Sequence, residues 1–130
     1  MRIHHLDHFV LTTADLERCL HFYADILGMK PDLSNGRCAL VFGSQKINVH
    51  RKKEEFLPAA RHVCYGSQDF CLIAEADDIQ SVQAELEAKG CIIELGPVPR
   101  MGAGGWMDSL YLRDPDENLV EISIYRRGNG

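Results

Sequence analysis

The chain has no long apolar segment and little clustered positive charge. No apolar stretch approaches the roughly 20 residues that a membrane-spanning helix needs. The formal net charge is -5, and only two short basic runs occur, at residues 51–53 and 126–127. A nucleic-acid-binding domain usually carries a basic patch, so the charge argues against that class of partner. We therefore expect neither a membrane nor a nucleic acid as partner.

Cysteine pairs with the spacing of a metal or redox motif are also missing. The five cysteines, an odd number, are scattered, and none belongs to a C-x-x-C pair. We therefore expect no disulfide framework and no zinc knuckle, and a reducing cytoplasm is the expected compartment. Residues 1–5 contain no apolar signal-peptide segment, which agrees with that location.

A pattern that occurs twice organises the 130 residues. Asp7–Leu11 runs into an acidic helix start and a helical stretch that ends at Gly28, and Asp69–Ile73 runs into the same signals up to Gly90. The length fits one domain with a core of its own. We therefore predict a single domain over residues 1–130, made of repeats at about 1–52 and 67–127.

Hydrophobic periodicity predicts one helix in each repeat, at residues 15–27 and 78–89, each begun by an aspartate and closed by a glycine. Apolar alternation and turn signals predict strands at residues 6–12, 37–42, 46–50, 69–74, 91–95, 109–113 and 118–125. Residues 96–105 are rich in glycine and proline and are predicted to form a loop. The fold class is therefore α+β, with two βαβββ modules whose mixed sheets form a curved trough.

Alternation along the strands separates apolar from polar faces. In the last strand, Val120, Ile122 and Ile124 should pack under a helix, so Glu121 points the other way. The same reasoning puts four more polar residues on the face away from the helices: His8, Asn48, His50 and Asp69. A buried carboxylate without a partner costs several kcal/mol, and a divalent cation would offset that cost. The simpler alternative is a Glu121 that faces solvent on a one-sided sheet.

Imidazole and carboxylate ligands with open positions suit Ni, Zn, Co, Mn or Fe as the divalent ion. His8, Asp69, Glu121 and His50 are the candidate metal ligands. Asn48, together with Arg100, Trp106 and Tyr111, is a candidate substrate contact, and Arg100 with the glycines after it is a candidate lid.

Three stretches together resemble the vicinal oxygen chelate superfamily: His8 in the first strand, the Phe22-Tyr23…Leu27-Gly28 signal, and Tyr111–Glu121. That superfamily includes glyoxalase I, extradiol dioxygenases, fosfomycin-resistance transferases and bleomycin-binding proteins. More narrowly, residues 45–50, 66–71 and 96–103 resemble glyoxalase domain-containing protein 5 and its small bacterial relatives. The resemblance implies a paired βαβββ fold, a homodimer and a divalent metal in the trough.

By position, the resemblance implies that His8 and Glu121 are metal ligands. Asp69 stands where many members have histidine, and Asn48 where bacterial glyoxalase I has glutamate. The implied activity is that of a glyoxalase-like lyase or isomerase. Its small substrate would chelate the metal through adjacent carbonyl and hydroxyl oxygens, while Glu121 or Asp69 serves as general base.

Two other functions are open at this point. An extradiol, ring-cleaving dioxygenase would hold iron or manganese through His8, His50 and Glu121, although the chain is short for that class. A non-enzymatic binding protein would sequester a small planar or hydrophobic compound, with Trp106, Tyr111 and Phe42 as candidate stacking groups.

Overall fold

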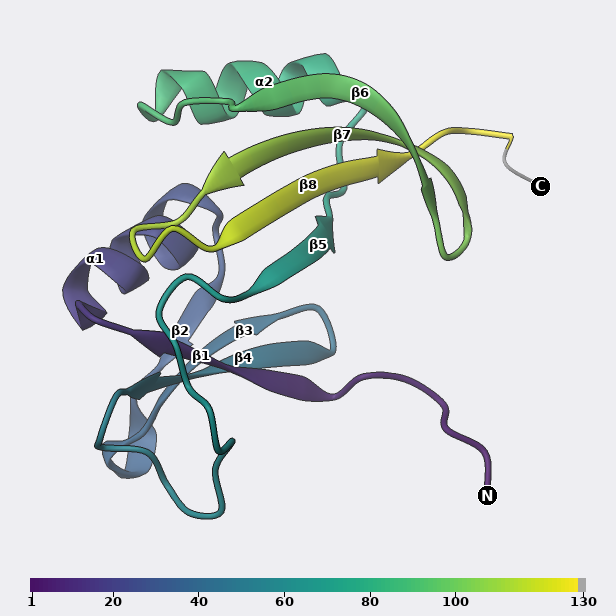
Figure 1. Cartoon of the computed structure of the whole chain (residues 1–130). Coiled ribbons are helices and arrows are strands. Elements are labelled where there is room, and N and C mark those ends of the chain that lie inside the picture. Colours follow the sequence, from purple (N-terminus) through teal and green to yellow (C-terminus); the bar gives the residue numbers. More distant parts are fainter. Residues whose placement is uncertain (129–130) are drawn as a thin grey trace. The chain divides into compact units, whose positions relative to one another are not determined.

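The computed structural model describes residues 1–128. The chain divides between Gly66 and Ser67 into two compact units. Each unit contains one four-stranded sheet, and the two sheets have the same topology (Figure 1). The strand order is β1-β4-β3-β2 in the first unit and β5-β8-β7-β6 in the second. The predicted α+β class with two βαβββ modules is therefore confirmed, whereas the prediction of a single domain stays a prediction.

The first unit consists of β1 (His8–Thr13), α1 (Leu16–Leu20), the π-helical turn η1 (His21–Ile26), β2 (Lys30–Asp32), the 3-10 turn η2 (Ser34–Gly36), β3 (Cys38–Phe42) and β4 (Gln45–Arg51). Strand β1 is parallel to β4, and the other neighbours are antiparallel. Asp15 caps α1 as predicted: its side chain accepts a hydrogen bond from the Arg18 amide at 3.1 Å. Among the strands, β2 was not predicted from the sequence.

The first helix differs from its prediction in its second half. The α-helix ends at Leu20, and the wider π-helical turn follows, in which the Leu27 amide donates to the Phe22 carbonyl at 3.0 Å. Phe22 and Tyr23 are both buried, with their rings edge to face at 4.8 Å. The buried side is therefore formed by Cys19, Phe22 and Tyr23. The helix periodicity had indicated Leu16, Leu20, Tyr23 and Leu27, and the three leucines are only half-buried.

The second unit consists of β5 (Asp69–Ile73), α2 (Ile79–Ala88), β6 (Leu95–Gly102), β7 (Gly105–Arg113) and β8 (Leu119–Tyr125). Asp78 caps α2 by accepting from the Ser81 amide at 2.8 Å. Helix α2 contacts β6 and β7 and runs along one face of this sheet (Figure 1).

The predicted loop at residues 96–105 is wrong, because most of it is strand β6. Strand β6 lies at the edge of its sheet, and there a proline removes no needed ladder bond. Pro97 and Pro99 are therefore tolerated within the strand. The predicted strand at 91–95 is wrong in turn, apart from Leu95.

The core of each unit lies between the helix and the sheet. In the first unit Leu11, Leu40 and Ile47 have no exposed surface. In the second unit Leu110, Leu112, Val120 and Ile122 are buried. This confirms Val120 and Ile122 of the predicted apolar face of β8, whereas Ile124 is only half-buried. No helix within residues 1–128 has both the length and the apolar character to cross a membrane.

Candidate functional site

Polar side chains gather on the face of the second sheet that is turned away from α2. In the register, Glu121 lies between Cys71 of β5 and Tyr111 of β7. Ser123, two residues further along β8, lies opposite Ser109 of β7. Since paired residues of neighbouring strands share a face, these five side chains lie together.

Ser123 is the centre of this polar group. Its side chain has no exposed surface, and its hydroxyl donates to the Oε2 atom of Glu121 at 3.2 Å. The Ser123 hydroxyl oxygen also lies 2.6 Å from Ser109 Oγ and 3.2 Å from Cys71 Sγ. A hydroxyl has one proton and two lone pairs, so Ser109 and Cys71 must be the donors in those two contacts. Cys71 is therefore held as a neutral thiol.

Two groups of this cluster have raised pKa values. Burial raises the pKa of the Cys71 thiol, the hydrogen bond with Ser123 partly opposes the rise, and the charge of Glu121 adds to it. Burial also raises the pKa of the Tyr111 hydroxyl, with a smaller rise from the charge of Glu121 and the hydrogen bond to it. Arg100 counteracts part of that rise, because its Nε donates to the Tyr111 hydroxyl oxygen at 2.9 Å. Two hydroxyls, those of Ser123 and Tyr111, thus hold the Glu121 carboxylate in place.

Asp69 lies on the same face as Glu121, one row away. It is paired with Leu119, two residues before Glu121, so the two carboxylates are separated along the strand by about 7 Å at a rise of ~3.3 Å per residue. Asp69 is exposed and Glu121 is half-buried. The second unit therefore presents two neighbouring carboxylates on one face.

The turn Asp114–Asn118 positions this site without belonging to it. The buried Asp114 carboxylate accepts from the amides of Asp116 and Asn118, both at 2.9 Å, and from the Asn118 side chain at 2.8 Å. The Asn118 side chain accepts from the Gln68 amide at 2.9 Å. The turn that carries much of the family resemblance thus fixes the start of β8 beside β5, which sets the register of Glu121.

His8 lies at the start of β1 in the first unit and is exposed. Its Nδ1 donates to the Asp7 carboxylate at 2.7 Å, and this bond lowers the pKa of Asp7. A ligating histidine commonly donates its other ring nitrogen to a carboxylate in this way. The arrangement therefore leaves Nε2 as the atom that could bind a metal ion.

The register separates His8 from His50. His8 is opposite Lys46 and His50 is opposite Thr12, so the two histidines are offset by four residues, or about 13 Å along the strands. Two nitrogens on one ion lie at most ~4 Å apart, since each metal–nitrogen bond is about 2.1 Å. Side chains stand roughly perpendicular to a sheet and keep the spacing of their strand positions. The first unit therefore does not bring His8 and His50 together.

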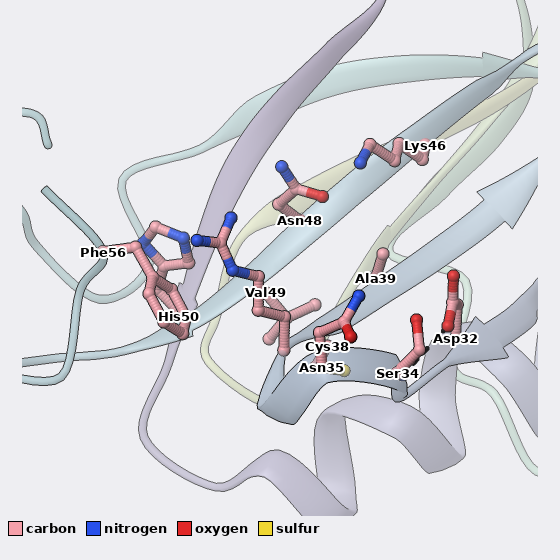
Figure 2. Close-up of a pocket in the computed structure, with 11 residues that line it drawn as sticks. Asp32, Ser34, Asn35, Cys38, Ala39, Lys46, Asn48, Val49, His50 and Phe56 are labelled. Carbon is pink, nitrogen blue, oxygen red and sulfur yellow. Dashed lines mark hydrogen bonds between the residues drawn. The ribbon is translucent and has the colours of Figure 1, made fainter. Parts of the chain in front are cut away.

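His50 instead lines a pocket of about 270 Å³ within the first unit. One wall of this pocket is formed by three alternate residues of β4: Lys46, Asn48 and His50 (Figure 2). Arg37 and Phe56 complete it, with the guanidinium carbon 4.2 Å from the ring centroid of Phe56. Strand alternation placed Lys46, Asn48 and His50 on one face, although Lys46 was not given a role. The sequence analysis missed Arg37 and Phe56 as pocket residues.

Two predicted substrate contacts have other positions than expected. Trp106 lies on the opposite face of β7 from Tyr111, because the register from Trp106 to Arg113 has no bulge and the two residues are an odd number of positions apart. It therefore does not join Tyr111. Arg100 belongs to strand β6 and not to a loop, so the predicted lid is not formed by this segment.

Divalent-metal chemistry fits these residues by donor type. His8 offers an imidazole nitrogen backed by a carboxylate, and Glu121 and Asp69 offer oxygens. Neither carboxylate forms an ion pair in the described part of the chain. A group of three or more potential metal-binding side chains is not found within residues 1–128. The fit to a metal ion therefore rests on donor type alone.

Comparison with known proteins agrees with this fold. The model of the Glyoxalase/Bleomycin resistance protein/Dioxygenase superfamily matches residues 5–122. A virulence protein of Salmonella typhimurium is 44% identical over 126 residues, which cover 96% of this chain and 87% of that protein. The glyoxalase domain-containing protein RDO1 of Mycosarcoma maydis is 42% identical over 126 residues, covering 97% and 71%.

A solved structure gives the same result. An integron cassette protein from the mobile metagenome of V. cholerae is 46% identical and superimposes with a TM-score of 0.92, covering 97% of this chain and 98% of its own. The chain therefore belongs to the glyoxalase/bleomycin resistance protein/dioxygenase superfamily.

Proposed function

We propose that this protein is a divalent-metal-dependent lyase or isomerase of the glyoxalase type. Its substrate would be a small molecule with adjacent carbonyl and hydroxyl oxygens. The observation that carries the proposal is the state of Glu121, which is half-buried, held by the Ser123 and Tyr111 hydroxyls, and without an ion-pair partner in the described part of the chain. A carboxylate fixed in this way is suited to bind a cation or to move a proton.

His8, Asp69 and Glu121 would hold the metal ion, which could be Ni, Zn, Co, Mn or Fe. A divalent ion supplies Lewis acidity, which polarises the adjacent oxygens of a bound substrate. Membership of the superfamily supports this part of the proposal.

The proton transfer is assigned to one of the two carboxylates, Glu121 or Asp69. It would take a proton from the carbon that bears the hydroxyl and return it to the neighbouring carbon, while the hydroxyl proton passes to the former carbonyl oxygen. Ser123 and Tyr111 act as positioning residues, because their hydroxyls donate to Glu121. Arg100 in turn holds the Tyr111 hydroxyl.

Binding of a small molecule without catalysis is the second candidate function. The pocket of the first unit, with Asn48 and His50 on its wall, favours it. An extradiol dioxygenase would need His8 and His50 on one ion, and the register of β1 and β4 gives that set no support. We therefore do not propose ring cleavage.

The assembly and the compartment belong to the same proposal. We expect a homodimer in the cytoplasm, with residues 1–130 as one domain. The scattered positions of the five cysteines, with no C-x-x-C pair, support the expected reducing compartment.

The test follows hydrogen exchange in heavy water by NMR. Hydroxyacetone, lactaldehyde and mandelaldehyde are incubated with the protein and each of the five metal ions. Enolisation by the protein should exchange the hydrogen on the hydroxyl-bearing carbon. The Glu121→Gln variant should lose about 100-fold or more of the rate, whereas Glu75→Gln, an exposed glutamate of no assigned role, should keep it. The proposal would be contradicted if, with every ion, exchange were no faster than without protein. Full activity in both Glu121→Gln and Asp69→Asn would also contradict it.

A further inference from the structure

The pocket of the first unit is positively charged within an acidic protein. Among its lining residues are two cations, Arg37 and Lys46, and one carboxylate, Asp32, so the local charge is +1 with His50 neutral. The whole chain carries a net charge of -5. A cavity that opposes the sign of the protein around it favours a ligand of opposite charge.

The two cations are not neutralised by neighbouring carboxylates. Within residues 1–128 neither Arg37 nor Lys46 takes part in an ion pair. The Asp32 carboxylate is already engaged, because it accepts from the Ser34 amide at 3.0 Å. That hydrogen bond is the largest cause of the lowered pKa of Asp32, and the charges of Lys46 and Lys30 contribute less. An anionic group in the pocket would therefore meet two cations that form no ion pair in the described part of the chain.

The pocket also presents an aromatic surface. The Phe56 ring is 42% exposed, with the Arg37 guanidinium over one face at 4.2 Å and the His50 ring edge-on at 5.8 Å. Figure 2 shows Phe56 and His50 side by side at one end of the pocket. A guanidinium stacked on a ring keeps its N–H edge free, and that edge matches a carboxylate with two parallel hydrogen bonds.

We propose that this pocket binds a small aromatic carboxylate. The carboxylate lies on Arg37 and Lys46, the ring lies against Phe56 and His50, and the Asn48 amide orients the molecule. The volume of about 270 Å³ is below the usual range of ~300–1,000 Å³ for drug-sized ligands, so the ligand is small.

This inference names the substrate class for the proposed function. Lys46 on the wall of the pocket is the strand partner of His8, so one end of the pocket adjoins a proposed metal ligand. Only the chemical fate of the ligand rests on the proposed function. Binding itself requires no metal and is tested without one.

The experiment is an NMR titration of the uniformly labelled full chain after treatment with a chelator. Benzoate is the probe, benzamide is its neutral counterpart, acetate lacks the ring, and inorganic phosphate is a different anion. We expect saturable benzoate binding that shifts the amide resonances of residues 37–39 and 46–50. Benzamide and acetate should each bind about ten-fold more weakly, as expected for the loss of a charge-assisted contact or of the ring contact.

Variants locate the binding. Arg37→Gln should weaken benzoate binding about ten-fold, and Phe56→Leu should weaken it while leaving acetate unchanged. The matched control is Arg61→Gln, the same substitution at an exposed arginine outside the pocket, which should bind like the native chain. If Arg37→Gln fails to fold, as judged from its spectrum, Lys46→Gln replaces it with the same expectation.

Three results would overturn the proposal: equal binding of benzamide and benzoate, phosphate binding as tight as benzoate with the same shifts, or benzoate shifts that lie outside the pocket. Metal titration of the same samples separates this proposal from the proposed function. Benzoate binding by a chain that takes up no metal would leave the pocket assignment standing and contradict the metal enzyme. Metal uptake without benzoate binding would contradict the pocket assignment and leave the proposed metal enzyme standing.

Discussion

Ser123 donates a hydrogen bond to the Oε2 atom of Glu121 across 3.2 Å, from a position with no exposed surface. The two residues are two positions apart on β8 and so share one face of the sheet. The carboxylate is therefore positioned by its own strand, and Ser109 and Cys71 complete the group around the serine.

Ser123→Ala should destabilise the protein, because it removes a donor to Glu121 and leaves Ser109 and Cys71 without their acceptor. We expect the free energy of unfolding to fall by about 1–3 kcal/mol, measured by urea denaturation. Ser44→Ala, in the exposed turn between β3 and β4, is the control and should change it by no more than about 0.5 kcal/mol. An equally small effect at Ser123 would show that the buried group does not contribute to stability.

Cys71 should react slowly with iodoacetamide at neutral pH. Burial raises the pKa of its thiol, and only the thiolate is the nucleophile. Cys64 is the internal reference within the same chain, because both residues are exposed by surface area but only the Cys71 sulfur lies against the Ser123 hydroxyl. Peptide mass spectrometry over time should find Cys64 labelled first, and the rate at Cys71 should rise as the solution becomes alkaline. Labelling of Cys71 ahead of Cys64 would contradict its assignment as a neutral donor to Ser123.

The ion pair between Glu94 and Arg113 should make stability depend on acid pH. Two hydrogen bonds, at 3.0 and 3.1 Å, join the side chains, and they lower the pKa of Glu94 below its ordinary value of 4.5. A carboxyl group with a lowered folded-state pKa stabilises the protein above its unfolded pKa and loses this effect as the pH falls through the folded value.

The difference in unfolding free energy between the native chain and Glu94→Gln should therefore be constant near neutral pH. It should shrink toward zero as the pH falls below about 4.5. Because both side chains are exposed, added salt should reduce it. Glu75→Gln removes a carboxylate without an ion-pair partner in the described chain and should show neither effect. A difference in unfolding free energy that grows toward acid pH would contradict the prediction.

The alternation of residues predicted more of the molecule than its composition did. Val120 and Ile122 against Glu121 predicted both faces of β8, because a strand has a strict period of two. The same argument failed at 96–102, where Pro97 and Pro99 indicated a loop. Strand position within a sheet decides whether proline is tolerated, and a single sequence does not give that position.

The candidate site was predicted in part for a similar reason. Strand alternation predicted that Glu121 and Asp69 share one face, as the register shows. Tyr111 was predicted as a substrate contact and not as the strand neighbour of Glu121. His8 and His50 share a face, but only the register shows that four residues separate them. Arg37 was predicted at the start of a strand and Phe56 between the repeats, and no sequence pattern links the two residues. Their contact at 4.2 Å depends on tertiary structure.

The most direct test of the metal assignment is the metal content of untagged protein, purified without added metal and measured by elemental mass spectrometry. The native chain should carry about one divalent ion per chain. His8→Ala and Glu121→Gln should lose it, whereas His62→Ala, an exposed histidine of no assigned role, should keep it. Native protein that contains no metal and takes up none on titration would contradict the account. So would stoichiometric metal in both His8→Ala and Glu121→Gln.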